Sequence, residues 1–219
     1  MSFPRTNRYV LGVSGASGAA YSLRLLEQLL LTGAEVHCVV STYGQRLLFD
    51  EKGIKQVKLD SMLPELASDA DHQRRFIAHP NKDVGAVIAS GSFLHDGMAV
   101  LPCSSTSLGA IATSAGSNLL TRAAMVTLKE RRPLIVCHRE MPLNLIDIEN
   151  MRTLALAGAI MCPTNPGFYL NPQSVEEIVD FIVGKVLDLL GVSHDLKTRW
   201  EDAHNAAKAA KTAQHADTP

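Results

Sequence analysis

Short apolar runs alternate with longer amphipathic stretches along most of this chain. Strands of a parallel sheet are buried on both faces and read as continuous apolar runs, and the connections between them are usually helices. We therefore predict an α/β fold of the Rossmann-like or flavodoxin-like class, a single domain over residues 1–200 with helices on both faces of a parallel sheet. The predicted strands are residues 9–13, 35–40, 84–89, 98–103, 134–137 and 158–162.

The segments between the apolar runs differ in how strongly they predict helices. The last helix is the clearest, since it begins at a capping box formed by Ser174 and Glu177 and ends at Gly191. Residues 51–83 are polar and irregular, with one weak helical stretch over 63–75. Residues 201–219 form a tail rich in Ala, Lys and His, which we expect to be frayed or to act as an arm in an oligomer. The other predicted helices are residues 19–31, 42–48, 105–115, 119–131 and 143–156.

Charge and composition limit the classes of partner. The 21 basic and 22 acidic residues leave a formal charge of −1, which gives no overall field to attract nucleic acid or an anionic membrane. No apolar run approaches the roughly 20 residues needed to cross a bilayer, and the first eight residues lack the apolar core of a signal peptide. We therefore expect a cytoplasmic protein that binds neither nucleic acid nor membrane, and any anion site must be local.

The cysteines and histidines show no metal-ligand spacing. The eight histidines form no H-E-x-x-H pair, and the cysteines stand singly with no C-x-x-C motif. Three of the four cysteines end apolar runs, which favours buried thiols at strand ends over reactive or metal-binding ones. The four are Cys38, Cys103, Cys137 and Cys162. No metal site is predicted.

Small hydroxylated and charged residues follow the predicted strands. Ligands of an open parallel sheet bind beyond the carboxyl ends of its strands, near the switch in strand order. The loops expected at that edge carry residues 14–18, Ser41, residues 90–92, residues 104–107, Arg139 with Glu140, and residues 163–169. The sequence therefore predicts a polar ring on an apolar scaffold.

Two of these loops suggest a phosphate site. The spacing of Gly12, Gly15 and Gly18 does not match the dinucleotide fingerprint, and the strand at 35–40 ends at Ser41 rather than at an acid for a ribose. A phosphate or mononucleotide is therefore favoured over a dinucleotide, although these glycines can also serve close strand–helix packing alone. The four hydroxyls of residues 104–107 open a predicted helix, which suits a phosphate monoester or ordinary N-capping.

Basic residues cluster in the later half of the chain. Most such side chains are simply solvated, and the ones in question are Arg122, Lys129, Arg131, Arg132 and Arg139. Arg139 and Glu140 differ because they directly follow a buried strand. A fixed cation beside a carboxylate suits phosphate binding with proton transfer, and the alternative is a structural ion pair.

Several segments together resemble the UbiX-type flavin prenyltransferases. They are G-A-S-G at 15–18, L-P-C-S at 101–104, L-K-E-R-R-P-L at 128–134, R-E-x-P at 139–142 and P-G-F-Y at 166–169. The resemblance covers roughly residues 8–200 in order and spacing, and the K-E-R-R-P-L and R-E-x-P segments are its specific part.

The resemblance implies a metal-independent transfer of a dimethylallyl group to N5 and C6 of reduced FMN. The donor would be dimethylallyl monophosphate or diphosphate, and the product, prenyl-FMN, would serve a UbiD-type decarboxylase, as in ubiquinone biosynthesis. The subunits would assemble into trimers and then into a dodecamer, with FMN near a subunit interface.

The resemblance also implies the residues of the site. FMN would contact Gly15, Ala16, Ser17, Ser41, Ser104, Ser105, Thr106, Ser107 and Arg139. The prenyl phosphate would contact Ser90, Arg122, Lys129, Arg139, Tyr169 and Lys185, with Glu51 contributed across an interface and Trp200 as a wall. Glu140 would be the acid/base, and Ser17, Arg139 and Lys129 the other catalytic residues. This set is chemically reasonable, since breaking an allylic C–O bond needs cations at the phosphate and π faces at the carbon.

Two alternatives stay open. A flavin-dependent cysteine decarboxylase would need an early catalytic histidine and a P-x-M-N-x-x-M segment, for which residues 142–145 are the nearest match. An FMN-binding carrier subunit of a decarboxylase complex would not require the basic, glutamate-bearing pocket.

Overall fold

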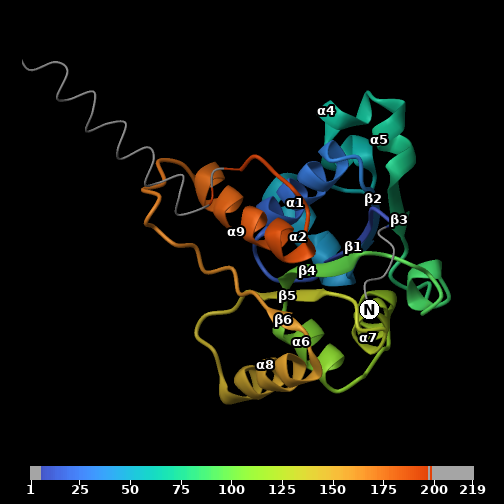
Figure 1. The fold of residues 1–219 in the computed structure, drawn as a ribbon, viewed down its shortest axis with the longest axis vertical. Coiled ribbons are helices and arrows are strands. Elements are labelled where there is room, and N and C mark those ends of the chain that lie inside the picture. Colours follow the sequence, from blue (N-terminus) through green and yellow to red (C-terminus); the bar gives the residue numbers. More distant parts are fainter. Residues whose placement is uncertain (1–5, 197, 199–219) are drawn as a thin grey trace, which may run out of the picture.

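The computed structural model describes residues 6–196 and Thr198, and within them the chain forms a six-stranded sheet whose strands are all parallel (Figure 1). The strand order is β3-β2-β1-β4-β5-β6, so the direction of winding reverses between β1 and β4. This is the switch point at which such sheets bind ligands. The strands are β1 (Arg8–Val13), β2 (Glu35–Val40), β3 (Phe76–His79), β4 (Gly97–Cys103), β5 (Leu134–His138) and β6 (Ile160–Met161).

Helices cover both faces of the sheet, as predicted. In Figure 1, α1 and α9 lie on one face, and α6, α7 and α8 lie on the other. The longer helices are α1 (Ala19–Leu31), α2 (Thr42–Lys52), α6 (Ser105–Ala112), α7 (Leu119–Lys129), α8 (Leu145–Ala157) and α9 (Val175–Leu190). None of the helices in the described part of the chain is long and apolar enough to cross a membrane.

The core is divided in two by the sheet because successive strand residues point to opposite faces. In β1, Leu11 and Val13 join the cluster beneath α1 and α9, whereas Val10 joins the cluster beneath α7. Every residue of β4 and β5 is buried. The predicted continuous apolar runs are therefore confirmed for the central strands.

The third strand was predicted at the wrong place. Residues 84–89 do not form a strand but a loop ending in the single-turn helix η1 (Val87–Ala89), where Val84 and Val87 are exposed. The true third strand, β3, pairs only with β2 at the edge of the sheet. A four-residue edge strand that is only half-buried leaves little apolar pattern in the sequence.

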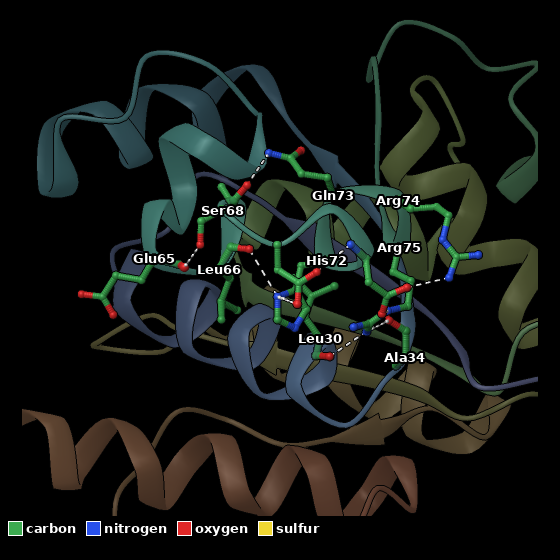
Figure 2. Close-up of polar contacts among 12 residues, drawn as sticks. Leu30, Ala34, Glu65, Leu66, Ser68, His72, Gln73, Arg74 and Arg75 are labelled. Atoms are coloured by element: carbon green, nitrogen blue, oxygen red, sulfur yellow. Dashed lines mark hydrogen bonds and ion pairs between the residues drawn. The ribbon is translucent and has the colours of Figure 1, made fainter.

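The irregular region before β3 consists of three short helices that attach to α1 (Figure 2). They are α3 (Leu59–Met62), α4 (Pro64–Ala67) and α5 (Ala70–Arg75), where one weak helix was predicted. Arg75 Nη1 donates to the carbonyl oxygens of Leu30, at 2.6 Å, and Ala34, at 3.2 Å. Its Nε pairs with Asp71 Oδ2 at 2.8 Å. A guanidinium therefore binds carbonyls at and just after the end of α1, where the helix dipole favours a cation.

We expect Arg75→Ala to lower the free energy of unfolding by about 1–3 kcal/mol, since it leaves the Leu30 and Ala34 carbonyls without their charged donor. Arg74→Ala is the matched control, because Arg74 pairs with the same Asp71 but its side chain is 79% exposed. It should change stability little. Urea unfolding of both variants checks this, and equal losses would show that only the shared ion pair matters.

Candidate functional site

The loops that follow β1, β4 and β5 are tied together by buried hydrogen bonds. Ser14, which is fully buried, donates its hydroxyl to the Pro102 carbonyl at 3.0 Å and accepts from the Ser104 amide at 2.8 Å. The Arg139 amide in turn donates to the Cys103 carbonyl at 3.1 Å. The structure thus brings the loop of residues 14–18, the segment 104–107 and Arg139 to one edge of the sheet, as the sequence predicted.

The amino end of α6 is rich in hydroxyls and has no acidic residue in its first turn. Ser104 is the N-cap, and its Oγ accepts from the Ser107 amide at 3.3 Å. Ser105 Oγ is 3.1 Å from His138 Nε2. Burial lowers the pKa of His138, against the opposing charges of Asp147 and Glu140, so this imidazole is neutral at pH 7. The first turn of α6 therefore offers amides and hydroxyls to an anion without an acidic residue of its own to repel it.

The amino end of α1 is already used by a carboxylate of the same chain. Glu51 accepts from the Ala19 amide at 2.8 Å and from the Gly18 amide at 3.2 Å. The sequence predicted that Glu51 would be contributed across an interface, whereas in the subunit it caps its own glycine loop. A ligand phosphate at this helix end would compete with that carboxylate, so α6 is the better phosphate site.

The glycines of this loop serve close packing. A Cβ on Gly15 would lie 2.3 Å from Tyr43 Cβ of α2, and Gly18 has a φ of +129°. Either position would clash or be strained with a side chain. Close packing and backbone conformation are therefore enough to explain why glycines occupy these two positions.

Arg139 carries an unsatisfied buried donor. Its Nε has no hydrogen-bond partner among the described residues. Its charge also opposes the burial that raises the pKa of Tyr21, so the guanidinium faces α1 as well as the loop after β5. A buried N–H without a partner costs free energy, and an anionic ligand would supply the missing acceptor.

Glu140 follows Arg139 but does not pair with it in the described part of the structure. Its side chain is exposed, and Oε1 accepts only the neighbouring Met141 amide, at 3.1 Å. The alternative interpretation of Arg139 and Glu140 as a structural ion pair is therefore wrong for the subunit. Both groups are free to act on a ligand.

The remaining FMN contacts implied by the resemblance lie at this same edge. Ala16 and Ser17 are in the loop after β1, and Ser17 is exposed. Ser41 is the N-cap of α2, and Thr106 is in the first turn of α6. Tyr169 packs edge-on against Phe181, one helical turn before Lys185 on α9. Trp200 lies outside the described residues.

Ser90 and Lys129 do not join this ring. Because residues 84–89 are not a strand, Ser90 lies in the loop that enters β4 at the amino edge of the sheet. Lys129 ends α7 at that edge and pairs with Glu130 at 2.6 Å, and Glu130 contacts the same loop at Gly91. Arg122 is exposed two turns earlier on α7. The expected phosphate-binding cations are therefore split between opposite edges of one subunit.

Arg132 has a structural role that its place in the basic cluster of the sequence did not predict. Arg132 is buried, and its guanidinium donates to the carbonyls of Phe93, at 2.7 Å, and Gly91, at 2.8 Å. It holds the loop of Ser90 in place rather than facing solvent. The signal that could have found it is its position directly before Pro133 and the buried strand β5.

Metal ligands are not grouped anywhere in the described residues. No cluster of three or more His, Cys, Asp or Glu side chains there could hold a metal ion. Among the described residues, the groups at the candidate site that could bind an anion are Arg139, the amides of a helix end and hydroxyls.

Comparison with known proteins gives consistent matches over most of the chain. Residues 4–187 match the Flavoprotein family. The flavin prenyltransferase UbiX of Halalkalibacterium halodurans is 42% identical over 192 residues, which cover 88% of this chain and 92% of that protein. The crystal structure of AnUbiX (PadA1) with FMN and dimethylallyl pyrophosphate has a TM-score of 0.75 at 33% identity, covering 85% of this chain and 93% of that chain. A dodecameric FMN-dependent UbiX-like decarboxylase from Escherichia coli O157:H7 has a TM-score of 0.77 at 35% identity, covering 88% of this chain and 98% of that chain.

We expect Ser14→Ala to lower the free energy of unfolding by about 1–3 kcal/mol, because the Ser104 amide loses its acceptor inside the protein. Hydrogen exchange at that amide should also become faster. Ser22→Ala is the matched control, since Ser22 is equally buried but its hydroxyl bonds only to the Ala19 carbonyl of its own helix. If both variants lose the same stability, Ser14 is an ordinary core serine and not the link between the loops.

Proposed function

Since this chain belongs to the Flavoprotein family, and within it to the UbiX-type flavin prenyltransferases, we propose that it joins a dimethylallyl group to N5 and C6 of reduced FMN. The observation that carries this proposal at the level of the site is Arg139, a half-buried cation whose buried Nε is unsatisfied, beside the amino end of α6. A flavin monophosphate has the anion that such a position requires.

The residues at the carboxyl edge fit FMN. The first turn of α6 and Arg139 would hold the phosphate, because Glu51 already occupies the amides at the start of α1. Ser17 and Ser41 would lie along the rest of the flavin. Bound reduced FMN supplies the nucleophilic N5 and C6 atoms for the reaction. The protein supplies a rigid frame, since the Ser14 hydroxyl fixes the loops of β1 and β4 relative to each other.

The cations of the prenyl-phosphate end would come together only between subunits. In one subunit Lys129 and Ser90 are at the amino edge, whereas Arg139, Tyr169 and Lys185 belong to the other side of the molecule. A second copy that presents its amino edge to the carboxyl edge of the first would complete the set. We therefore infer that the active enzyme is a homo-oligomer, and the resemblance to the UbiX-type enzymes implies trimers that assemble into a dodecamer.

An exposed apolar face on α8 supports this self-association. Leu145, Ile146 and Leu156 are 71%, 72% and 74% exposed, and Met141 just before the helix is 86% exposed. Soluble monomers rarely expose so many large apolar side chains on one element, which marks an interaction surface. The E. coli neighbour, which is dodecameric, has the same fold.

The basic residues and the glutamate of the completed site would then have separate roles in the reaction. When the allylic C–O bond breaks, negative charge grows on the phosphate, and Arg122, Lys129, Arg139 and Lys185 would stabilise it. Glu140 would take a proton from the flavin or give one to the departing phosphate. Tyr169 would face the prenyl group. The product would pass to a UbiD-type decarboxylase, and this destination and a cytoplasmic location remain predictions.

Anaerobic incubation with reduced FMN and dimethylallyl monophosphate should convert FMN into a flavin heavier by one C5 prenyl unit. Mass spectrometry of the extracted flavin measures this, with dimethylallyl diphosphate as a second donor. EDTA should not lower the yield, because the basic side chains neutralise the phosphate. Bound FMN of unchanged mass with both donors would instead favour the carrier alternative.

Glu140→Gln should slow single-turnover prenylation by about 10²–10⁴-fold, because the amide cannot exchange a proton. FMN binding and thermal unfolding should stay close to wild type, since the Glu140 side chain is exposed and bonds only to its neighbour's amide. Glu65→Gln, at an exposed glutamate of α4, is the matched control and should leave the rate unchanged. A wild-type rate in Glu140→Gln would move the acid/base role elsewhere.

A further inference from the structure

Two cysteines meet at the β5–β6 edge of the sheet. The β5–β6 ladder pairs Ile135 with Ile160 and Val136 with Met161, and the Cys162 amide donates to the Val136 carbonyl at 2.9 Å. The next pair in this register is Cys137 with Cys162. Both side chains pack into the cluster beneath α9. Neighbouring strands lie about 4.8 Å apart, within the roughly 4.4–6.8 Å that separates the Cα atoms of a disulfide.

The two sulfur atoms of this pair have different surroundings. Cys137 is fully buried, whereas Cys162 is only half-buried. The neighbouring Cys137 thiol and the Lys185 ammonium of α9 lower the pKa of Cys162 against the effect of burial. The neighbouring Cys162, together with burial, raises the pKa of Cys137. The thiolate is therefore favoured at Cys162, the less buried residue of the pair.

We propose that Cys162 and Cys137 form a peroxide-reactive dithiol, in which Cys162 is oxidised first and Cys137 closes the disulfide. The Cys162 thiolate attacks hydrogen peroxide, which breaks the O–O bond and gives a sulfenic acid and hydroxide. The Cys137 thiol then attacks that sulfur, the S–S bond forms and water leaves. In sum, two thiols lose two electrons and two protons, and one peroxide becomes two waters.

The other two cysteines provide an internal comparison. Cys38 and Cys103 are fully buried, and burial raises the pKa of Cys38 to about 12 and that of Cys103 further still. Such thiols do not attack peroxide directly, because the thiolate is the nucleophile in that first step. Only the β5–β6 pair combines a partly exposed, stabilised thiolate with a second thiol in contact. This inference concerns sulfur chemistry alone and does not depend on the proposed function.

The test maps the thiols of the full-length, fully reduced protein after treatment with hydrogen peroxide. Free thiols are blocked with N-ethylmaleimide in denaturant, and tryptic peptides are analysed without reduction. Arg139 and Arg152 lie between the two cysteines, so the disulfide would link two separate peptides. We expect that linked pair, its loss on adding dithiothreitol, and fully alkylated Cys38 and Cys103.

Variants separate the two steps. Cys137→Ser should leave a sulfenic acid at Cys162 that dimedone traps, Cys162→Ser should abolish peroxide reactivity, and Cys38→Ser should behave as wild type. In the folded protein at pH 7, Cys162 should react with N-ethylmaleimide at least about tenfold faster than Cys38. The proposal is overturned if wild-type protein resists peroxide, if Cys38 or Cys103 oxidises equally fast, or if Cys162 oxidises without joining Cys137.

Discussion

The buried hydroxyl of Ser14 is the interaction on which the site depends. It donates to the Pro102 carbonyl and accepts from the Ser104 amide, so one side chain fixes the ends of β1 and β4 at the point where the strand order reverses. The rim of the cleft that a parallel sheet offers to ligands is made of these loops. Because these loops are held together, the first turn of α6 and Arg139 have defined positions. An anion could then bind without a rearrangement of the loops.

The chain caps two helix ends at this edge of the sheet in different ways. Both α1 and α6 begin at this edge with amides that need acceptors. The chain satisfies those of α1 with its own Glu51 and leaves the start of α6 to hydroxyls. Arg139 then adds a cation whose Nε has no acceptor in the described structure. One helix end is closed by the protein and the other is suited to a phosphate.

A single subunit does not bring together the cations that are expected to bind the prenyl phosphate. Lys129 and the loop of Ser90 are held at the amino edge by Glu130 and Arg132, while Arg139 is at the carboxyl edge. Strand direction makes this separation unavoidable, because α7 returns the chain to the start of the next parallel strand. The exposed apolar face of α8 and the split cations both support the proposal that subunits assemble to complete the site.

The sequence by itself determined the fold class, five of the six strands and the hydroxyl-rich loops at the carboxyl edge, since continuous burial of a segment is a local property that its own residues record. Only the tertiary structure decided that β3 is the half-buried edge strand at Phe76–His79, that Glu51 caps α1, and that Ser90 lies at the opposite edge from Ser104. The pairing of strands determines which end of the sheet a loop reaches, and that pairing depends on contacts between residues far apart in the chain. Residue type and spacing alone cannot report such contacts.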